Sequence, residues 1–331
     1  LEIRKGKIGE QDLVPVSEHA WRTGGAASGG STMFLPLNSQ VKVDDLLHGI
    51  IIQSGNDASI ALAEYIAGTE DGFADMMNET AERLGMKNSH FMNATGLPHP
   101  EHYSSAHDMA ILARAIINED PAHYAIYSKK EFFWNNIKQG NRNLLLYRDK
   151  TVDGLKTGHT SSAGYNLVAS SKRNGRRVVS VVVGTESAEA RAAESSKLLN
   201  WALQSFDTPK LYDAGQTISQ VKVYKGAANA VNVGFLEAAY ITIPHGSGGN
   251  IKPVLETVQP VVAPIQKGQV VGTLKVMSEG QVLAEKNVVA LNAVEEAGRF
   301  GRMYDGIVLW FKNLFVDNYS AQAFMIQAAS F

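Results

Sequence analysis

Two short segments constrain this chain more than any other feature. Ser54-Gly55-Asn56 interrupts two stretches with helical spacing of apolar residues, and Lys156-Thr157-Gly158 stands at the start of a β-branched region. A serine in a tight turn between helices can direct its hydroxyl into a cleft, and a lysine on an edge strand can line the same cleft. The two segments therefore predict a mixed α/β domain in which a hydroxyl and an ammonium group converge.

Residues 1–208 are predicted to form that domain. Apolar periodicity indicates helices over residues 45–53, 57–67, 71–84, 106–118 and 188–206. Asp44 is the predicted N-cap of the first helix, and Leu198 and Leu199 are both expected to be buried by the last. Two β-branched strands joined by an Asn-Gly turn, over residues 166–171 and 176–184, predict an antiparallel sheet that Lys156-Thr157-Gly158 begins or precedes.

The chain changes character after residue 208. Short apolar runs between Gly- and Pro-bearing turns, without a helical stripe, predict a small all-β domain over residues 209–294. Residues 295–315 contain a strongly amphipathic helix that is rich in aromatic side chains. We expect this helix to lie on a membrane surface, although a terminal helix packed on the β domain fits the same pattern. Residues 316–331 carry no pattern that we can interpret.

Composition excludes several classes of protein. The net charge of -2 leaves no basic field for nucleic acid, and no apolar run is long enough to cross a bilayer. The absence of cysteine excludes disulfides and thiolate metal sites, and no cofactor is predicted. His99, Glu101, His102 and His107 lie in a proline-bearing loop whose spacing fits no standard metal site, so we interpret them as a solvated loop.

The two motifs supply groups that acyl transfer by a serine requires. Ser54 can relay a proton to a departing nitrogen, and the side chain of Asn56 can bind a substrate amide because it offers both a donor and an acceptor. Lys156 supplies positive potential, Thr157 a hydroxyl, and Gly158 close access to the backbone. Each motif by itself also fits an ordinary helix–helix turn or a strand end, and only the pair favours a reactive site.

Arg191 is a further candidate, at the start of the helix that follows the two strands. A guanidinium there can bind a substrate carboxylate through two hydrogen bonds. The residue type alone favours a plainer interpretation, in which an exposed arginine pairs with Glu189 or Glu194 on the same helix. The sequence leaves both interpretations open.

The chain resembles a low-molecular-mass penicillin-binding protein, namely a D-alanyl-D-alanine carboxypeptidase of the penicillin-binding protein 5/6 group. The resemblance extends from Leu1 to about residue 315. It rests on Gln53-Ser54-Gly55-Asn56-Asp57-Ala58, Tyr103-Ser104-Ser105-Ala106, Val152-Asp153-Gly154-Leu155-Lys156-Thr157-Gly158-His159-Thr160 and Ala163-Gly164-Tyr165-Asn166-Leu167-Val168-Ala169. Gly55, where class A β-lactamases have Asp, and the added β domain favour the carboxypeptidase.

This resemblance implies a penicillin-recognising α/β domain with an antiparallel sheet, followed by the small β domain and the amphipathic helix. It implies an enzyme on the periplasmic face of the bacterial inner membrane, held there by that helix. Such an enzyme removes the terminal D-alanine from peptidoglycan pentapeptides through an acyl-enzyme, and it is acylated by β-lactam antibiotics. No metal is implied.

The resemblance also assigns roles to the candidate residues. It gives Ser54 the proton relay, Asn56 a substrate-amide contact and Lys156 electrostatic stabilisation. It implies that Thr157 and Arg191 bind the terminal carboxylate of the substrate. Gly158 belongs to the same motif, and the backbone N–H of His159 is implied as one oxyanion donor.

The nucleophile of this family lies in a Ser-x-x-Lys motif that begins a helix. Ser39-Gln40-Val41-Lys42 precedes a predicted helix in an extended segment, and Ser219-Gln220-Val221-Lys222 falls in the β domain, so neither qualifies. The resemblance places the motif just ahead of Leu1. We therefore expect that the catalytic start is missing from this sequence and that the chain as given is inactive. The alternatives are a non-catalytic peptidoglycan-binding or scaffold protein and, as a third reading, a β-lactamase.

Overall fold

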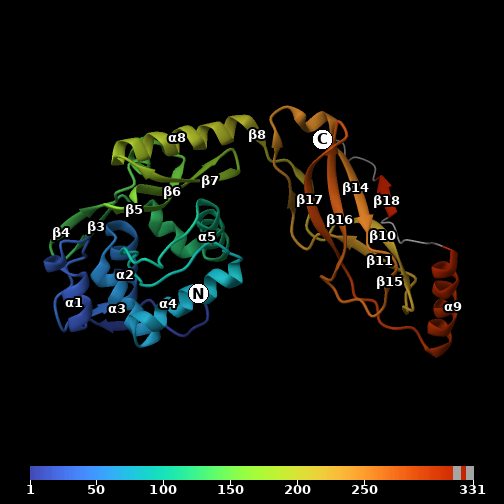
Figure 1. Ribbon diagram of the computed structural model, residues 1–331, viewed down its shortest axis with the longest axis horizontal. Helices are drawn as coiled ribbons and strands as arrows, with labels where there is room; N and C mark the ends of the chain where they lie inside the picture. Colours follow the sequence, from blue (N-terminus) through green and yellow to red (C-terminus); the bar gives the residue numbers. More distant parts are fainter. Residues whose placement is uncertain (316–321, 326–331) are drawn as a thin grey trace. The chain divides into compact units, whose positions relative to one another are not determined.

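The computed structural model describes residues 1–315 and 322–325. The chain divides into two compact units, Leu1–Leu203 and Gln204–Phe331, and each is described by itself. Figure 1 shows helices on both sides of a small sheet in the first unit and a larger, predominantly antiparallel sheet in the second.

The first unit follows the predicted alternation of helices and strands. Its helices are α1 (Glu18–Gly24), η1 (Ala26–Ser28), α2 (Val43–His48), η2 (Gly49–Gln53), α3 (Asn56–Ala67), α4 (Glu70–Leu84), α5 (Ala106–Glu119), α6 (Pro121–Tyr124), η3 (Ala125–Ser128), α7 (Leu145–Arg148) and α8 (Ala188–Ser205). Its strands are β1 (Leu13–Pro15), β2 (Gln40–Lys42), β3 (Glu131–Trp134), β4 (Ile137–Gly140), β5 (Val152–Thr160), β6 (Gly164–Arg173) and β7 (Arg176–Thr185).

The start of α2 differs from the sequence prediction. The N-cap is Lys42 rather than Asp44, and no side chain caps the helix. The first amides of the helix are satisfied by another segment instead, because the N–H of Val43 donates to Asp12 O and that of Asp44 donates to Glu10 O. Two backbone carbonyls thus replace the predicted carboxylate cap, and Asp44 lies inside the first turn.

The strands β5, β6 and β7 form an antiparallel sheet with β5 at one edge. The turn between β6 and β7 has Asn174 at φ 50° and Gly175 at φ 78°, as the Asn-Gly signal predicts. Helix α8 covers one face and α5 the other (Figure 1). Leu199 is buried against the first face, but the prediction for Leu198 is wrong, because its side chain is 38% exposed.

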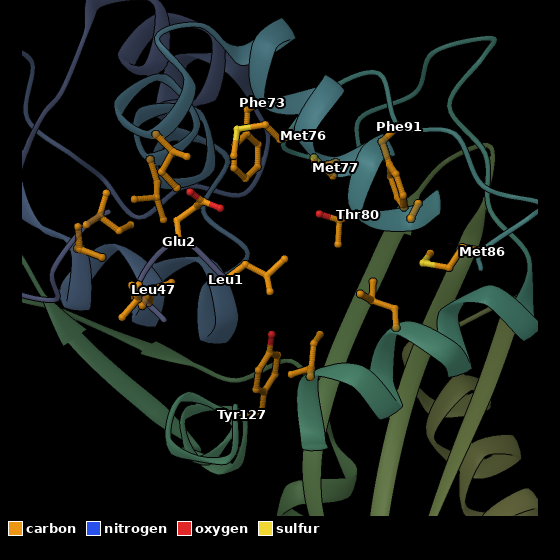
Figure 2. A pocket seen from close by; sticks show the side chains of 18 residues that line it. Leu1, Glu2, Leu47, Phe73, Met76, Met77, Thr80, Met86, Phe91 and Tyr127 are labelled. Atoms are coloured by element: carbon orange, nitrogen blue, oxygen red, sulfur yellow. The ribbon is translucent and has the colours of Figure 1, made fainter. Parts of the chain in front are cut away.

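The helical half of this unit encloses an apolar cavity of about 500 Å³. Figure 2 shows Leu47 from α2, Phe73 and Met76 from α4, and Leu1 around it. Phe73 and Met76 of α4 therefore face a cavity, and they are only half-buried. The cavity offers dispersion contacts and almost no polar partner, so it contains no chemistry of its own.

The second unit is built around a seven-stranded sheet in the order β15-β10-β11-β17-β16-β14-β18. Its elements are β8 (Phe206–Asp207), β9 (Lys210–Tyr212), β10 (Thr217–Tyr224), β11 (Ala230–Gly234), β12 (Ala239–Tyr240), β13 (Ile243–Pro244), η4 (Ser247–Asn250), β14 (Lys252–Thr257), β15 (Val261–Val262), β16 (Val270–Ser278), β17 (Gln281–Ala290), α9 (Arg299–Phe315) and β18 (Gln322–Met325). Buried valines and leucines of these strands form its core. Apart from β18, the tail over residues 316–331 lies outside the described residues.

Helix α9 coincides with the predicted amphipathic segment. Several of its large apolar side chains are exposed, with Phe300 at 85% and Tyr304 at 69%. The helix is held to the β domain by its polar face, because the Asp305 carboxylate accepts the backbone N–H of Lys225 and Arg302 pairs with Glu296. Among the described residues, no helix is both long and apolar enough to cross a membrane.

Candidate functional site

A pocket of about 860 Å³ in the first unit brings the two predicted motifs together. Its lining includes Ser54 and Asn56 from the helical half and Lys156 from the edge strand β5. The ammonium of Lys156 donates a hydrogen bond to the Ser54 hydroxyl. The convergence predicted from the sequence is therefore present in the structure.

Ser54 owes its position to an unusual end of the preceding helix. Helix α2 continues as the π-helix η2, and Ser54 follows it in the left-handed region at φ 62° and ψ 38°. A serine is disfavoured there, and such single π-helical turns often occur at functional sites. Gly49, at the start of η2, packs closely on Met33, because an added Cβ would lie 2.2 Å from the sulfur of that residue. This geometry holds the Ser54 hydroxyl at the pocket.

Lys156 lies on β5, whose outer edge faces the pocket rather than another strand. Its ammonium also donates to Thr157 O at 3.1 Å. Burial, reinforced by the nearby charges of Arg142 and Arg191, lowers the pKa of Lys156 from 10.5 to about 8. The group is therefore close to half-charged at mildly alkaline pH.

Asn56 is the first residue of α3 and is buried at the floor of the pocket. Its backbone N–H donates to Ser31 O at 2.9 Å. Gly30 packs so tightly on it that an added Cβ would lie 2.8 Å from the Asn56 side-chain nitrogen. The segment around Ser31 therefore forms one wall of the pocket.

Arg191 is buried, with only 4% of the residue exposed, so the surface ion-pair interpretation is wrong. The acids proposed as its partners pair elsewhere, Glu189 with Arg148 and Glu194 with Lys197. The guanidinium of Arg191 donates to the backbone carbonyls of Asn166 and Arg142, at 3.4 and 3.2 Å. Burial lowers its pKa. A buried guanidinium held by carbonyls retains its affinity for a carboxylate.

The remaining predicted residues follow Lys156 along β5. Thr157, Gly158 and His159 all line the pocket. The ring of His159 packs on Tyr165 with the ring centres 4.0 Å apart, and the Arg191 guanidinium lies 5.6 Å from the centre of the same tyrosine. An edge strand leaves alternate backbone N–H groups outside the ladder, where they can bind a ligand.

Arg142 is a pocket residue that the sequence did not indicate. It lies in the loop between β4 and α7, between the buried Asn141 and Asn143. The Asn143 side chain donates to Gly154 O at 3.2 Å, which ties this loop to β5. Arg142 itself donates to the Ser31 hydroxyl at 2.7 Å. No local motif surrounds it, so only the tertiary contact reveals it.

The electrostatic character of the pocket is one-sided. Lys156, Arg142 and Arg191 line it, and no Asp or Glu is among the described lining residues. Because unpaired cations in a partly dry cleft are costly, the arrangement favours an anionic ligand. The described residues contain no group of His, Asp or Glu side chains that could hold a metal ion.

Neither Ser-x-x-Lys segment begins a helix. Residues Gln40–Lys42 form β2, and Ser219 with Lys222 lies within β10. Both segments are extended, as predicted, so their serine and lysine side chains do not face each other across a helical turn. The pocket thus brings Ser54 and Lys156 together, and neither Ser-x-x-Lys segment is among its described lining residues.

Comparison with known proteins agrees with this geometry. Residues 2–187 match the family model of D-alanyl-D-alanine carboxypeptidases, and residues 206–296 match that of the C-terminal domain of penicillin-binding protein 5. The D-alanyl-D-alanine carboxypeptidase DacA of Haemophilus influenzae is 46% identical over 95% of this chain and 80% of its own length. DacC of Escherichia coli is 42% identical over 95% of the chain and 79% of its own length.

A solved structure gives the same result for the fold. Penicillin-binding protein 5 from Haemophilus influenzae superposes with a TM-score of 0.82 at 44% sequence identity. The match covers 89% of this chain and 86% of that one. The predicted fold class, an α/β domain followed by a β-rich domain and a final helix, is therefore confirmed.

Proposed function

Since the chain belongs to the D-alanyl-D-alanine carboxypeptidases of the penicillin-binding protein 5/6 group, we propose that its pocket binds peptidoglycan pentapeptides and that it removes their terminal D-alanine. We assign this activity to residues 1–208, with residues 209–294 as an accessory β domain. The observation that supports the proposal most is the Lys156–Ser54 hydrogen bond in a pocket lined by three cations and, among its described lining, no acid.

The terminal carboxylate of the peptide is assigned to Arg191 and Thr157. Arg191 is buried and lines the pocket, with no acid partner among the residues that the structure describes, so a carboxylate would satisfy its charge. Asn56 is suited to the penultimate amide, since its side chain can donate and accept at once. Gly158 leaves the strand open to close approach, and the backbone N–H of His159 is assigned to the oxyanion.

The proposed reaction forms and hydrolyses an acyl-enzyme. A serine hydroxyl attacks the carbonyl carbon of the penultimate D-alanine and gives its proton to a lysine. The attack converts the carbonyl group into a tetrahedral oxyanion. The C–N bond then breaks, and the departing amine takes a proton through Ser54. Lys156 stabilises the negative charge that develops. Water hydrolyses the ester and frees both the shortened peptide and the serine.

The serine nucleophile of this reaction is not among the described residues. The relatives are carboxypeptidases, and they give no support to the expectation that the chain is inactive. A non-catalytic peptidoglycan-binding protein would share the carboxylate site and lack the covalent step. A β-lactamase would rapidly hydrolyse the acyl-enzyme that it forms with a β-lactam.

Labelling of the natural gene product with a fluorescent penicillin separates these functions. Stable covalent labelling supports the carboxypeptidase, no labelling supports the binding protein, and rapid release of the label supports the β-lactamase. Lys156→Ala should lower the rate of labelling at least tenfold, because a positioned cation in a dry site contributes a few kcal/mol. Lys150→Ala, which changes an exposed lysine of the same unit, is the matched control.

We assign α9 to the periplasmic surface of the inner membrane, where it would anchor the protein. Phe300, Tyr304 and Trp310 are exposed on this helix, and burying aromatic rings at headgroup depth favours binding. Phe300→Ser with Trp310→Ser should abolish sedimentation with phosphatidylethanolamine–phosphatidylglycerol vesicles. Val258→Ser, at a position 68% exposed in the β domain, is the control. Unchanged sedimentation of the double variant would favour a helix without a membrane role.

A further inference from the structure

Asp57 is a buried carboxylate one residue beyond the Ser54-Gly55-Asn56 motif, and the proposed reaction gives it no role. It is completely inaccessible to solvent. One of its oxygens accepts the backbone N–H groups of Met33 and Ala58 at 2.8 and 2.9 Å. The other accepts the Thr32 hydroxyl at 2.7 Å and the backbone N–H of Leu35 at 3.0 Å. Both oxygens are therefore engaged by donors only.

Three of these four donors belong to residues 31–35, which we call the strap. The strap has no regular secondary structure, and Phe34 adopts φ 65°, a conformation that side chains with a Cβ disfavour. A segment without its own ladder of hydrogen bonds takes its shape from the groups that bind it. Here the Asp57 carboxylate accepts three hydrogen bonds from the strap, and Asn135 and Gln139 each donate one to carbonyls of the strap.

The strap ends in the pocket at Ser31. Its carbonyl accepts the backbone N–H of Asn56 at 2.9 Å, and its hydroxyl accepts the Arg142 guanidinium at 2.7 Å. Arg142 is otherwise exposed, so this hydrogen bond restricts an arginine that solvent alone would leave mobile. A change in the strap would therefore be felt at Asn56 and at Arg142 together.

We infer that Asp57 is a positioning residue for ligand binding: its carboxylate sets the strap, and the strap directs Arg142 toward the carboxylate end of a bound peptide and Asn56 toward its penultimate amide. This inference rests on the proposed function and adds to it a second arginine, Arg142, at the ligand's anionic end. An amide cannot replace the carboxylate, because either orientation of an asparagine would turn its NH₂ group toward two donors.

The alternative is a purely structural role, and the chain offers a matched control for it. Asp108 is likewise buried, at 1% exposure, and accepts the Asn88 N–H and the Ser89 hydroxyl at 2.7 Å each. It does not line the pocket. Both donors reach the same oxygen of Asp108, so Asp108→Asn can keep these hydrogen bonds and controls for the loss of a buried charge away from the ligand.

The test is calorimetric titration of residues 1–331 with an N-acetylated tripeptide ending in D-Ala-D-Ala, as the free acid and as the C-terminal amide. The measured quantity is the ratio of the two Kd values. Partial unfolding weakens the binding of both peptides equally, so its effect cancels in this ratio. A misdirected Arg142 weakens the binding of the free acid alone. Asp57→Asn should reduce the preference for the acid about tenfold. Asp108→Asn should leave it unchanged.

Two further variants keep the result decisive. Thr32→Val removes one donor of the strap and leaves Asp57 in place, so it should reduce the same preference by a smaller factor even if Asp57→Asn does not fold. In the Arg142→Ala background, Thr32→Val and Asp57→Asn should have no further effect on the ratio. An unchanged ratio in Thr32→Val and Asp57→Asn, in a chain whose preference still depends on Arg191, would overturn the inference and leave the proposed function standing. A chain without any preference for the acid would overturn both.

Discussion

The charge of Lys156 makes ligand binding depend on pH in a predictable direction. With a pKa of about 8, the free lysine is about 90% charged at pH 7 and about 10% charged at pH 9. A bound carboxylate stabilises the ammonium form, so the pKa of Lys156 rises in the complex. Binding should therefore take up part of a proton at pH 8 and close to none at pH 6.

The size of the effect follows from the same pKa. Between pH 7 and pH 9 the charged form of the free lysine falls about tenfold, so the affinity for a D-Ala-D-Ala peptide should fall by up to the same factor, or about 1.4 kcal/mol. Arg142 and Arg191 stay charged throughout this range, and the peptide carboxylate is ionised throughout. Comparison with a variant that lacks the Lys156 ammonium isolates the contribution of this group from those of the other lining residues.

The assay is calorimetric titration from pH 6 to pH 10 in buffers of different ionisation enthalpy, which reports affinity and proton uptake together. Lys156→Met is the control, and it should bind weakly and lose the fall in affinity that is centred near pH 8. The reasoning fails if wild type and Lys156→Met show parallel pH profiles. It also fails if the wild-type midpoint lies near 10.5, because the pocket would then leave the lysine unperturbed.

Three further changes test other parts of the structure by chemical denaturation. Lys156→Met should stabilise the fold at pH 7: the unfolded chain binds the lysine proton at a higher pH than the folded chain, so wild-type stability falls as pH drops from 10.5 to about 8 and is level below. Gly49→Ala should cost about 1–3 kcal/mol, because its Cβ would meet Met33 at 2.2 Å. Leu199→Ala should cost about 2–5 kcal/mol, and the exposed Leu198→Ala far less.

Elements with local signals were predictable from the sequence. Helices α3 and α4 end at residues 67 and 84, as predicted, and Gly68 and Gly85 follow them in the left-handed conformation. The Asn174-Gly175 turn and the extent of α9 followed from short-range patterns in the same way. In each case the residues that decide the structure lie within one or two turns of each other.

Features that depend on distant segments were not predictable. Glu189 and Glu194 suggested a surface partner for Arg191, but packing of α8 on the sheet buries the guanidinium beside Asn166. The cap of α2 was missed because carbonyls of Glu10 and Asp12 satisfy its first amides. Periodicity indicates which face of an element is apolar. It does not indicate which distant carbonyl groups accept hydrogen bonds from that element in the fold.

The three cations of the pocket come from separate segments of the chain. Three cations close together in a partly dry cleft repel one another, and burial together with this repulsion lowers the pKa of Lys156 and of Arg191 in the free protein. No local pattern would favour such a cluster, so it persists only where other contacts fix its members: the loop around Asn143 for Arg142, carbonyls for Arg191, and Ser54 for Lys156. A ligand carboxylate would relieve that repulsion. The cost to the free protein therefore becomes selectivity for anions on binding.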